Sequence, residues 1–401
     1  MKLHLIQGRL TQISPGAAQI RTQAGARDLS LKNPSPAKLG DIVEYNLFDE
    51  SLRVLTPNRS GTSNWMERTL DARRIRGVQT RARVESMIRG FFLKQNFLET
   101  KTPLLVPCPG MEPHIRPFRV NGTQTSYLPT SPEFAMKRLL VGGLEKIFQI
   151  TSSFRDEPKS VTHQPEFTIL EWYRAYAGYE DIMVDTEEML ANIATQIFGK
   201  PVIPYQGASI DVSAPWPRLK IRDLFQEKVG IDLVVANTRD LLAHECARLG
   251  HAVSPQENWD DIYFKIWLNE IEPHLPQGRA VFITRYPESQ AALAVVDADF
   301  DGSRWARRFE VYAGGFELGN AFEELTDPVE QRARFEKDMK TRQQVYGDTF
   351  PTHAMDEEFL AALGEGMPPS GGIAMGVDRM VMLFSDETDI RYTHWLESEG
   401  I

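Results

Sequence analysis

The sequence predicts an α+β protein that divides into a small all-β module, residues 1–60, and a larger domain, residues 61–401. The first 60 residues are short alternating runs separated by turn residues, which is typical of strands. Beyond them, stretches with helical periodicity are interspersed with further alternating strands. The formal charge changes at the same place, from +3 in the first 60 residues to −13 in the remaining 341.

The composition excludes several classes of protein. With 42% hydrophobic and 25% charged residues, the 401-residue chain has the balance of a folded globular protein. Its longest apolar run is Ala291–Val296, whereas a membrane-spanning helix needs about 20 residues. The first residues alternate like a strand and lack the apolar stretch of a signal peptide. Because Cys108 and Cys246 form no CxxC pair, we expect a cytoplasmic protein with no thiolate zinc site and no membrane contact.

Five strands are predicted in the N-terminal module, because the alternating runs there are separated by turns rich in Gly, Pro, Asn and Asp. These runs are Leu3–Ile13, Ala18–Arg21, Leu29–Leu31, Ile42–Leu47 and Arg53–Leu55. The pattern indicates a small antiparallel barrel or sheet, followed by a linker at Asn58–Asn64. The slight positive charge is weak support for nucleic-acid binding by this module.

The larger domain opens with a helix predicted over Thr80–Asn96, where four apolar residues fall at spacings of 0, 3, 4 and 7. The four are Val84, Met87, Ile88 and Phe91. A short strand, Leu104–Val106, is predicted after the helix. The purely structural interpretation of this apolar stripe is that it packs in the core of its own domain.

Two strands, Lys146–Ile150 and Glu166–Arg174, are predicted on either side of a polar loop. Alternation places four side chains on one face of the second strand, namely Phe167, Ile169, Glu171 and Tyr173. A carboxylate among such residues is rarely buried without a partner. Glu171 therefore lies either in water at the edge of a sheet or in a site that receives an amine.

A β-hairpin is predicted around the glycine turn at Gly314 and Gly315. It carries Glu310 and Glu317, and Glu324 follows seven residues later. Acids spaced in this way suit either a divalent cation that bridges phosphate oxygens or a cationic substrate. The alternative is that they form salt bridges with Arg304, Arg307 and Arg308. The next helix is predicted to begin at Asp327 as the N-cap.

The last recognisable element is a glycine-rich strand, Pro369–Gly376, that runs into a helix with Arg379 in its first turn. Glycines allow a ligand to approach the backbone, and the start of a helix with an arginine suits an anion. The chain has no GxxxxGK[ST], GxGxxG, HExxH or GxSxG motif. Phosphate-loop, zinc-hydrolase and serine-hydrolase functions are therefore disfavoured.

Taken in order, these stretches resemble the three signature motifs of class II aminoacyl-tRNA synthetases over about residues 64–401. The first motif is matched by Val84–Pro107, the second by Phe154–Phe167 and the third by Gly372–Arg379. The lysine-specific subclass is resembled most closely, at Thr130–Glu133, Leu170–Tyr173 and Glu317–Asn320. The resemblance implies an antiparallel sheet flanked by helices and a homodimer formed through the first motif.

Within that subclass the chain is more similar to the GenX/PoxA family, the ligases that attach (R)-β-lysine to elongation factor P. The residues at Ser131–Arg138 and Glu171–Arg174 match those typical of that family. Ala291 and Ala292 stand where the synthetase typically has Ser-Pro, and Ala374 stands where it has glycine. About 60 N-terminal residues are also fewer than the anticodon-binding barrel of the synthetase needs.

The resemblance implies ATP and Mg²⁺ as cofactors. Arg155 and Arg379 are the expected catalytic residues, with Arg155 holding the α-phosphate and the substrate carboxylate and Arg379 the γ-phosphate. Further ATP contacts are expected from Asp156, Glu157, Gln164, Phe167, Glu317 and Leu318. Glu310 and Glu317 would hold the metal.

The resemblance also implies an amino-acid site for lysine or (R)-β-lysine. Its expected residues are Ser131 and Glu133 near the backbone amine, Glu171, Tyr173 and Glu324 at the side-chain ammonium, and Asn320 at the carboxylate. The expected acceptor is a lysine of elongation factor P, and tRNA is disfavoured. Two alternatives remain open: a lysyl-tRNA synthetase-like enzyme that charges tRNA or another acceptor, and a non-catalytic synthetase-like regulatory protein.

Overall fold

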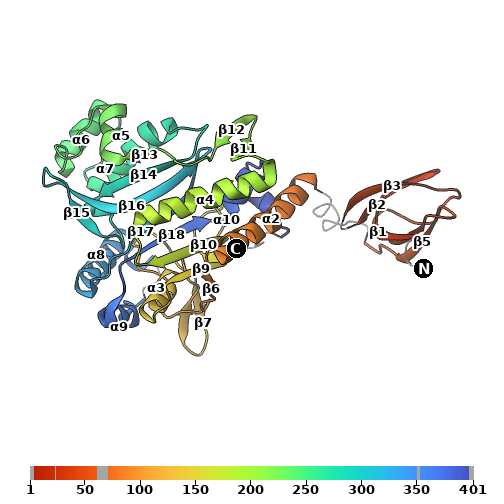
Figure 1. Ribbon diagram of the computed structural model, residues 1–401, viewed down its shortest axis with the longest axis horizontal. Helices are drawn as coiled ribbons and strands as arrows, with labels where there is room; N and C mark the ends of the chain where they lie inside the picture. Colours follow the sequence, from red (N-terminus) through yellow and green to blue (C-terminus); the bar gives the residue numbers. More distant parts are fainter. Residues whose placement is uncertain (1–3, 23, 61–70, 350–352, 397–401) are drawn as a thin grey trace. The chain divides into compact units, whose positions relative to one another are not determined.

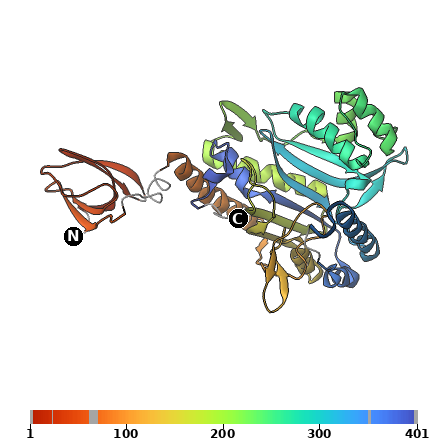
Figure 2. The same cartoon turned by 180° about the vertical axis from the view of Figure 1, so that it is seen from behind.

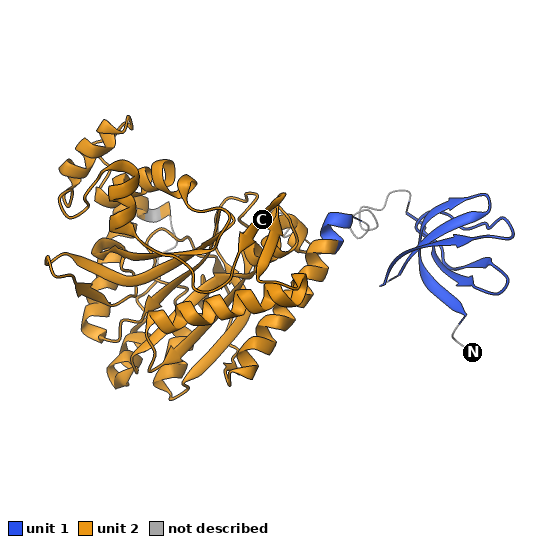
Figure 3. Cartoon of the chain, turned by 45° about the horizontal axis from the view of Figure 1, so that its top comes forward, with its two compact units in different colours: residues 1–75 blue, residues 76–401 orange. Residues whose placement is uncertain are grey.

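The computed structural model describes residues 4–22, 24–60, 71–349 and 353–396. The chain divides into two compact units, Met1–Ile75 and Arg76–Ile401 (Figure 3). Most of the predicted linker, Asn58–Asn64, falls outside the described residues. None of the described helices is both long and apolar enough to cross a lipid bilayer.

The first unit contains a five-stranded antiparallel sheet in the order β3-β2-β1-β4-β5. The strands are β1 (Leu5–Ser14), β2 (Ala17–Thr22), β3 (Gly25–Ser30), β4 (Ile42–Asn46) and β5 (Ser51–Thr56). The first half of β1 pairs with β4 and its second half with β2, with a register shift between Leu10 and Gln12. Alternate side chains such as Leu10, Ile20 and Val43 form its core, so the predicted all-β module is confirmed.

The second unit is built on a nine-stranded sheet in the order β13-β14-β16-β17-β18-β10-β9-β6, with β15 beside β16 (Figure 1). Only the β13–β14 and β6–β9 pairs are parallel; the central pairs are antiparallel, as predicted. The strands are β6 (Leu98–Glu99), β9 (Lys146–Phe154), β10 (Glu166–Ala175), β13 (Arg218–Lys220), β14 (Val281–Pro287), β15 (Val296–Ala298), β16 (Arg304–Ala313), β17 (Phe316–Glu323) and β18 (Ser370–Gly376). Two separate hairpins are β7 (Arg119–Asn121) with β8 (Thr125–Tyr127), and β11 (Val202–Tyr205) with β12 (Ala208–Asp211).

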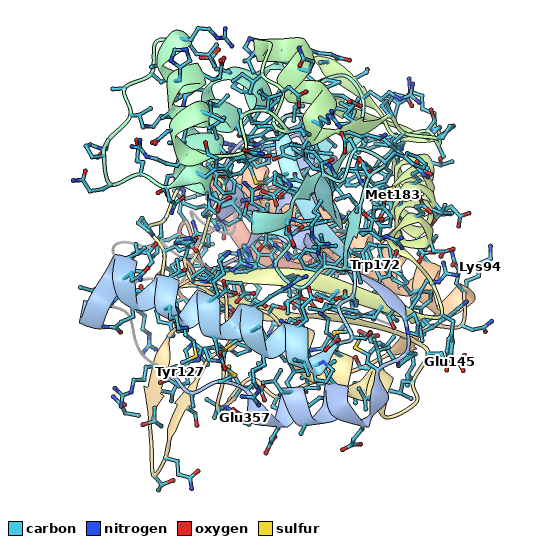
Figure 4. All side chains as sticks on the ribbon, turned by 90° about the vertical axis from the view of Figure 1, so that its left-hand side faces the viewer. Lys94, Tyr127, Glu145, Trp172, Met183 and Glu357 are labelled. Atoms are coloured by element: carbon cyan, nitrogen blue, oxygen red, sulfur yellow. The ribbon has the colours of Figure 1, made fainter. Side chains whose placement is uncertain are left out.

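Helices cover both faces of this sheet (Figures 1 and 2). One apolar core joins the sheet to α2 (Ala72–Lys94), α4 (Tyr179–Phe198) and α10 (Val377–Phe384). Trp172 of β10 and Met183 of α4 both lie in this core, whereas Glu145 and Glu357 are at the surface (Figure 4). The second core joins the other face to α3 (Glu133–Val141), α5 (Ile221–Val229), α6 (Arg239–Arg248), α7 (Trp259–Ile266), α8 (Pro328–Tyr346) and α9 (Glu357–Gly366).

Most of the predicted elements are confirmed. The glycine hairpin is β16–β17, the glycine-rich strand and its helix are β18 and α10, and the carboxylate of Asp327 caps α8 by accepting from two backbone N–H groups. The predicted strand at Leu104–Val106 is wrong. Only Val106 forms an isolated bridge, to Tyr127, and the edge strand is β6 instead. Proline on both sides of this segment removes the N–H groups that a longer ladder needs.

Candidate active site

A cavity of about 290 Å³ lies on the three central strands β10, β18 and β17. The register explains why: Ala374 in the middle strand is paired with Glu171 on one side and Asn320 on the other. Gly372 is paired in the same way with Tyr173 and Phe322. Because side chains alternate along a strand, the intervening Ile373 and Met375 point into the core on the opposite face.

Gly372 makes the close packing of this floor possible. A Cβ atom at position 372 would lie 2.3 Å from the ring of Tyr173 and 2.4 Å from Oε1 of Glu324. Any side chain there would displace the two groups that border the cavity. The glycine-rich sequence of β18 is therefore required by close approach of neighbouring side chains rather than by a turn.

The structure brings most of the predicted site residues together. Those that line the cavity are Ser131, Glu133, Arg155, Glu157, Gln164, Phe167, Tyr173, Glu317, Leu318, Asn320, Glu324 and Arg379. Glu171 lies fully buried beside them, and Glu310 is also buried. The side chain of Leu318 packs in the core, so it offers main-chain atoms to the cavity. Asp156 is not a lining residue; its carboxylate forms a half-exposed ion pair with Arg116 at 2.9 Å.

One end of the cavity carries guanidinium groups. Arg379 is held by the main-chain O of Glu317 and by Nε2 of His163, both at 2.7 Å. Arg155 lies over the ring of Phe167, 5.0 Å from its centroid. Burial lowers the pKa of His163, and the charge of Arg379 lowers it further, so this histidine is neutral. This end is suited to anions.

Two donors in the cavity wall are shielded from solvent and have no partner among the described residues. They are Nε of Arg155 and Nε2 of Gln164. Leaving a buried donor unpaired costs about 1–3 kcal/mol. A ligand that accepts hydrogen bonds, as a nucleotide does, would satisfy both.

Glu310 and Glu317 are the carboxylates available for a metal ion at this end. Burial, together with the charge of Glu310, raises the pKa of Glu317 to about 7. Glu310 is paired with Arg308 at 2.7 Å, which balances one of the two charges. The described residues contain no group of three or more His, Cys, Asp or Glu side chains placed to hold a metal. The donor set fits a cation that also binds phosphate oxygens.

The other end of the cavity carries carboxylates. Glu171 accepts hydrogen bonds from Oγ of Ser131 at 2.5 Å and from the hydroxyl of Tyr173 at 2.9 Å. Burial raises the pKa of Glu171 from its ordinary value of 4.5 to about 8, and the charge of Glu133 adds to this effect. Its two hydrogen-bond partners are neutral, so they do not balance its charge. A buried carboxylate in this state is suited to receive an ammonium group.

Lys137 is a buried cation beneath this end. Its Nζ lies 2.5 Å from a carboxylate oxygen of Glu133 and 2.5 Å from one of Glu324. Burial alone would lower the pKa of Lys137, but the two carboxylates outweigh burial and raise it, so the lysine stays charged. Glu324 is therefore paired with Lys137, whereas no ion pair joins Glu171 to a cation among the described residues.

Two residues at the cavity were not among the predicted site residues, namely Glu112, which lines it, and Lys137, which pairs with Glu133 and Glu324. Arg308 was expected only as a salt-bridge partner of the acids, and it does pair with Glu310. Lys137 stands four residues after Glu133 on a helix, and Arg308 two before Glu310 on a strand, so both spacings place the pairs on one face. These signals were present in the sequence. Glu112 lines the cavity from an irregular segment, where no periodicity could have shown its direction.

The fold and the cavity define a class of protein. Residues 64–396 match the family of class II tRNA synthetases for D, K and N. The chain therefore belongs to this class II synthetase family, and the predicted fold class is confirmed.

The chain is similar in sequence to lysine–tRNA ligases. Those of Dehalococcoides mccartyi and Moorella thermoacetica are 39% and 40% identical over 315 residues, and that of Coxiella burnetii is 39% identical over 323. The matched region is 78% of this chain and 62 to 63% of those proteins. The chain thus spans less than two thirds of the length of these curated relatives.

The raised pKa of Glu171 predicts a pH-dependent stability. A carboxyl whose pKa is raised in the folded state stabilises the fold most below its unfolded value and loses that contribution as pH rises toward about 8. In urea denaturation, Glu171→Gln should gain stability relative to the unliganded wild type as the pH increases from about 5 to about 8. The control Glu336→Gln, at an exposed position, should follow the wild type. Parallel profiles for Glu171→Gln and wild type would contradict this assignment.

Removing the buried ammonium should be costly. Lys137→Met leaves Glu324 buried without a counter-charge, so we expect a loss of about 3–5 kcal/mol in the free energy of unfolding. Adding Glu324→Gln to that variant should restore part of the loss. Lys340→Met, at an exposed position of α8, should change stability by less than about 0.5 kcal/mol. If Lys137→Met behaves like this control, the ion pairs contribute nothing to stability.

Proposed function

We propose that the protein is an ATP-dependent amino-acid ligase that activates lysine or (R)-β-lysine as an adenylate and transfers it to a lysine side chain of elongation factor P. The observation that carries the activation step is the polarity of the cavity. Guanidinium groups lie at one end and buried carboxylates at the other, which matches a substrate with phosphates at one end and an ammonium group at the other.

In the first step a carboxylate oxygen of the amino acid attacks the α-phosphorus of ATP, and pyrophosphate leaves. Both reactants are anions, so Arg155 and Arg379 lower the barrier by holding them together. Glu310 and Glu317 are the proposed holders of Mg²⁺, which neutralises phosphate charge. In the second step the neutral amine of the acceptor attacks the activated carbonyl, loses a proton and displaces AMP.

Recognition of the amino acid is assigned to the carboxylate end. Glu171 receives the side-chain ammonium, oriented by Ser131 and Tyr173, and Asn320 contacts the substrate carboxylate. Nε of Arg308 donates to Oδ1 of Asn320 at 2.9 Å, which fixes the amide so that its NH₂ group remains the free donor. Glu133 is then available to bind the amine that lies next to the reacting carboxylate of the amino acid.

Elongation factor P is the proposed acceptor because two residues that line the same cavity differ from those of lysyl-tRNA synthetases. Ala374 and Ala292 both border the cavity, and each differs from the residue typical of lysyl-tRNA synthetases. The methyl group of Ala374 reshapes the floor between Glu171 and Asn320, where the amino acid would lie. Such a change suits an altered amino acid, as (R)-β-lysine is.

A second candidate function is the charging of tRNA. It is favoured by the lysine–tRNA ligases that share 38 to 40% identity with the chain and by the slightly basic β module that precedes the family match. Intact-mass measurement of elongation factor P and acid-precipitation assays of tRNA distinguish the two acceptors, because each reports a product that the other reaction does not form.

The proposal predicts that elongation factor P gains the mass of one lysyl residue when it is incubated with the enzyme, ATP and (R)-β-lysine or lysine. Arg155→Gln should lower the rate by about 100-fold or more, because it removes a charge that acts on the transition state. Lys340→Met serves as a fully active control. Aminoacylated tRNA with no change in the mass of the factor would instead establish the second candidate, and no ATP–pyrophosphate exchange with either lysine would refute both.

We also propose a homodimer formed through the first-motif stretch. Four leucines there are 40 to 59% exposed, and they lie on α2, on β6 and in the segment that follows. These are Leu93, Leu98, Leu104 and Leu105. Apolar groups gathered in this way favour burial against a second copy.

Leu105→Glu should therefore shift the protein from dimer to monomer in size-exclusion chromatography with light scattering, because a charge in the interface would lose its hydration. Leu268→Glu is the matched control: Leu268 is 55% exposed and lies outside this stretch. A monomeric wild type, or dimers in both variants, would contradict the proposed interface.

A further inference from the structure

Glu112 is a carboxylate that the reaction described above leaves unused. It lies between β6 and β7 and lines the cavity together with Ser131, Glu133 and Arg155. The residue as a whole is half-buried, but its Oε2 atom is shielded from solvent and has no hydrogen-bond partner among the described residues. A shielded carboxylate oxygen without a partner is unfavourable. Its position in the cavity wall therefore points to a ligand that supplies a positive charge.

The backbone holds Glu112 in this position. Its main-chain O accepts a hydrogen bond from Arg342 of α8 at 2.5 Å. Thr130 donates to the main-chain O of Pro109 through its N, at 3.0 Å, and its Oγ1, at 2.9 Å. Gly110 has a φ of +154°, and a Cβ there would lie 2.5 Å from Oε2 of Glu112. Glycine thus leaves the space into which the carboxylate turns.

Two of the protein cations near Glu112, Lys137 and Arg342, have partners of their own. Lys137 bridges Glu133 and Glu324, and Arg342 bonds the main-chain O of Glu112 and the ring of His353. Burial raises the pKa of Glu112, and the charge of Glu133 raises it further, whereas Arg155 and Arg342 lower it. The Glu112 carboxylate therefore lies within the fields of both the carboxylate end and the phosphate end of the cavity.

We propose that Glu112 is a specificity-determining residue that, together with Glu133, binds the ammonium group next to the reacting carboxylate of the amino acid. This inference rests on the proposed activation of lysine or (R)-β-lysine. That ammonium group stands between the reacting carbon and the side chain, and Glu112 lines the cavity where the charges of both Arg155 and Glu133 act on it. Glu171 then binds the ammonium group at the far end of the side chain, so the two amines of the substrate bind to different carboxylates.

The test uses Glu112→Gln in the full chain, because glutamine keeps the shape and removes the charge. By calorimetry, the affinity for the lysine isomer that supports ATP–pyrophosphate exchange should fall by about 10-fold or more. KM in the exchange assay should rise accordingly, with little change in kcat. The affinity for ATP should not change. Glu112→Asp retains the charge and should lose less than Glu112→Gln.

A substrate analogue and a matched variant separate recognition from general damage. The analogue 6-aminohexanoate lacks the amine in question, so its affinity should be the same in the wild type and in Glu112→Gln. Asp338→Asn removes a carboxylate of α8 that also acts on Glu112 electrostatically but does not line the cavity, and it should bind lysine normally. Unchanged lysine affinity in Glu112→Gln, or equal losses for lysine and ATP, would overturn this inference alone. A wild type that binds neither lysine isomer would overturn the proposed function as well.

Discussion

The alternation of side chains along β10, β18 and β17 is the constraint on which the rest of the structure depends. Leu170, Trp172, Ile373 and Met375 fill the core against α2, α4 and α10. The residues between them, on the other face, form the floor of the cavity. A slip of one residue in any of these strands would move charged groups into the core and apolar groups into the site. The packing of one face therefore fixes the chemistry of the other.

The cavity gathers charges that a folded protein usually avoids. Burial raises the pKa of Glu171, which forms no ion pair among the described residues. Burial and the charge of Glu310 likewise raise the pKa of Glu317. Lys137 offsets part of this negative charge by pairing with Glu324, and Arg308 does so by pairing with Glu310. The proposed substrates, with an ammonium group at one end and phosphates at the other, would supply the missing charges. Charged side chains without a counter-charge are typical of binding sites, where a ligand supplies the missing charge.

The two units contribute differently to what is known of the protein. The family match covers residues 64–396 and so includes every residue that lines the cavity. The strands β1–β5 of the first unit lie entirely outside that match. The two proposed acceptors are accordingly supported by different parts of the chain: elongation factor P by Ala374 and Ala292 in the cavity, and tRNA by the slightly basic β module.

The sequence by itself determined the elements and much of the site. Period-two alternation placed Phe167, Ile169, Glu171 and Tyr173 on one face, and the glycine turn and glycine-rich strand marked β16, β17 and β18. The tertiary structure decided which charges pair. Lys137 meets Glu324 across 187 residues of chain, and Glu112 reaches the cavity from a segment without periodicity. It also decided that Leu104–Val106 is not a strand. Local patterns depend on neighbours within a few residues, whereas charge pairing depends on distances through space that only the folded chain defines.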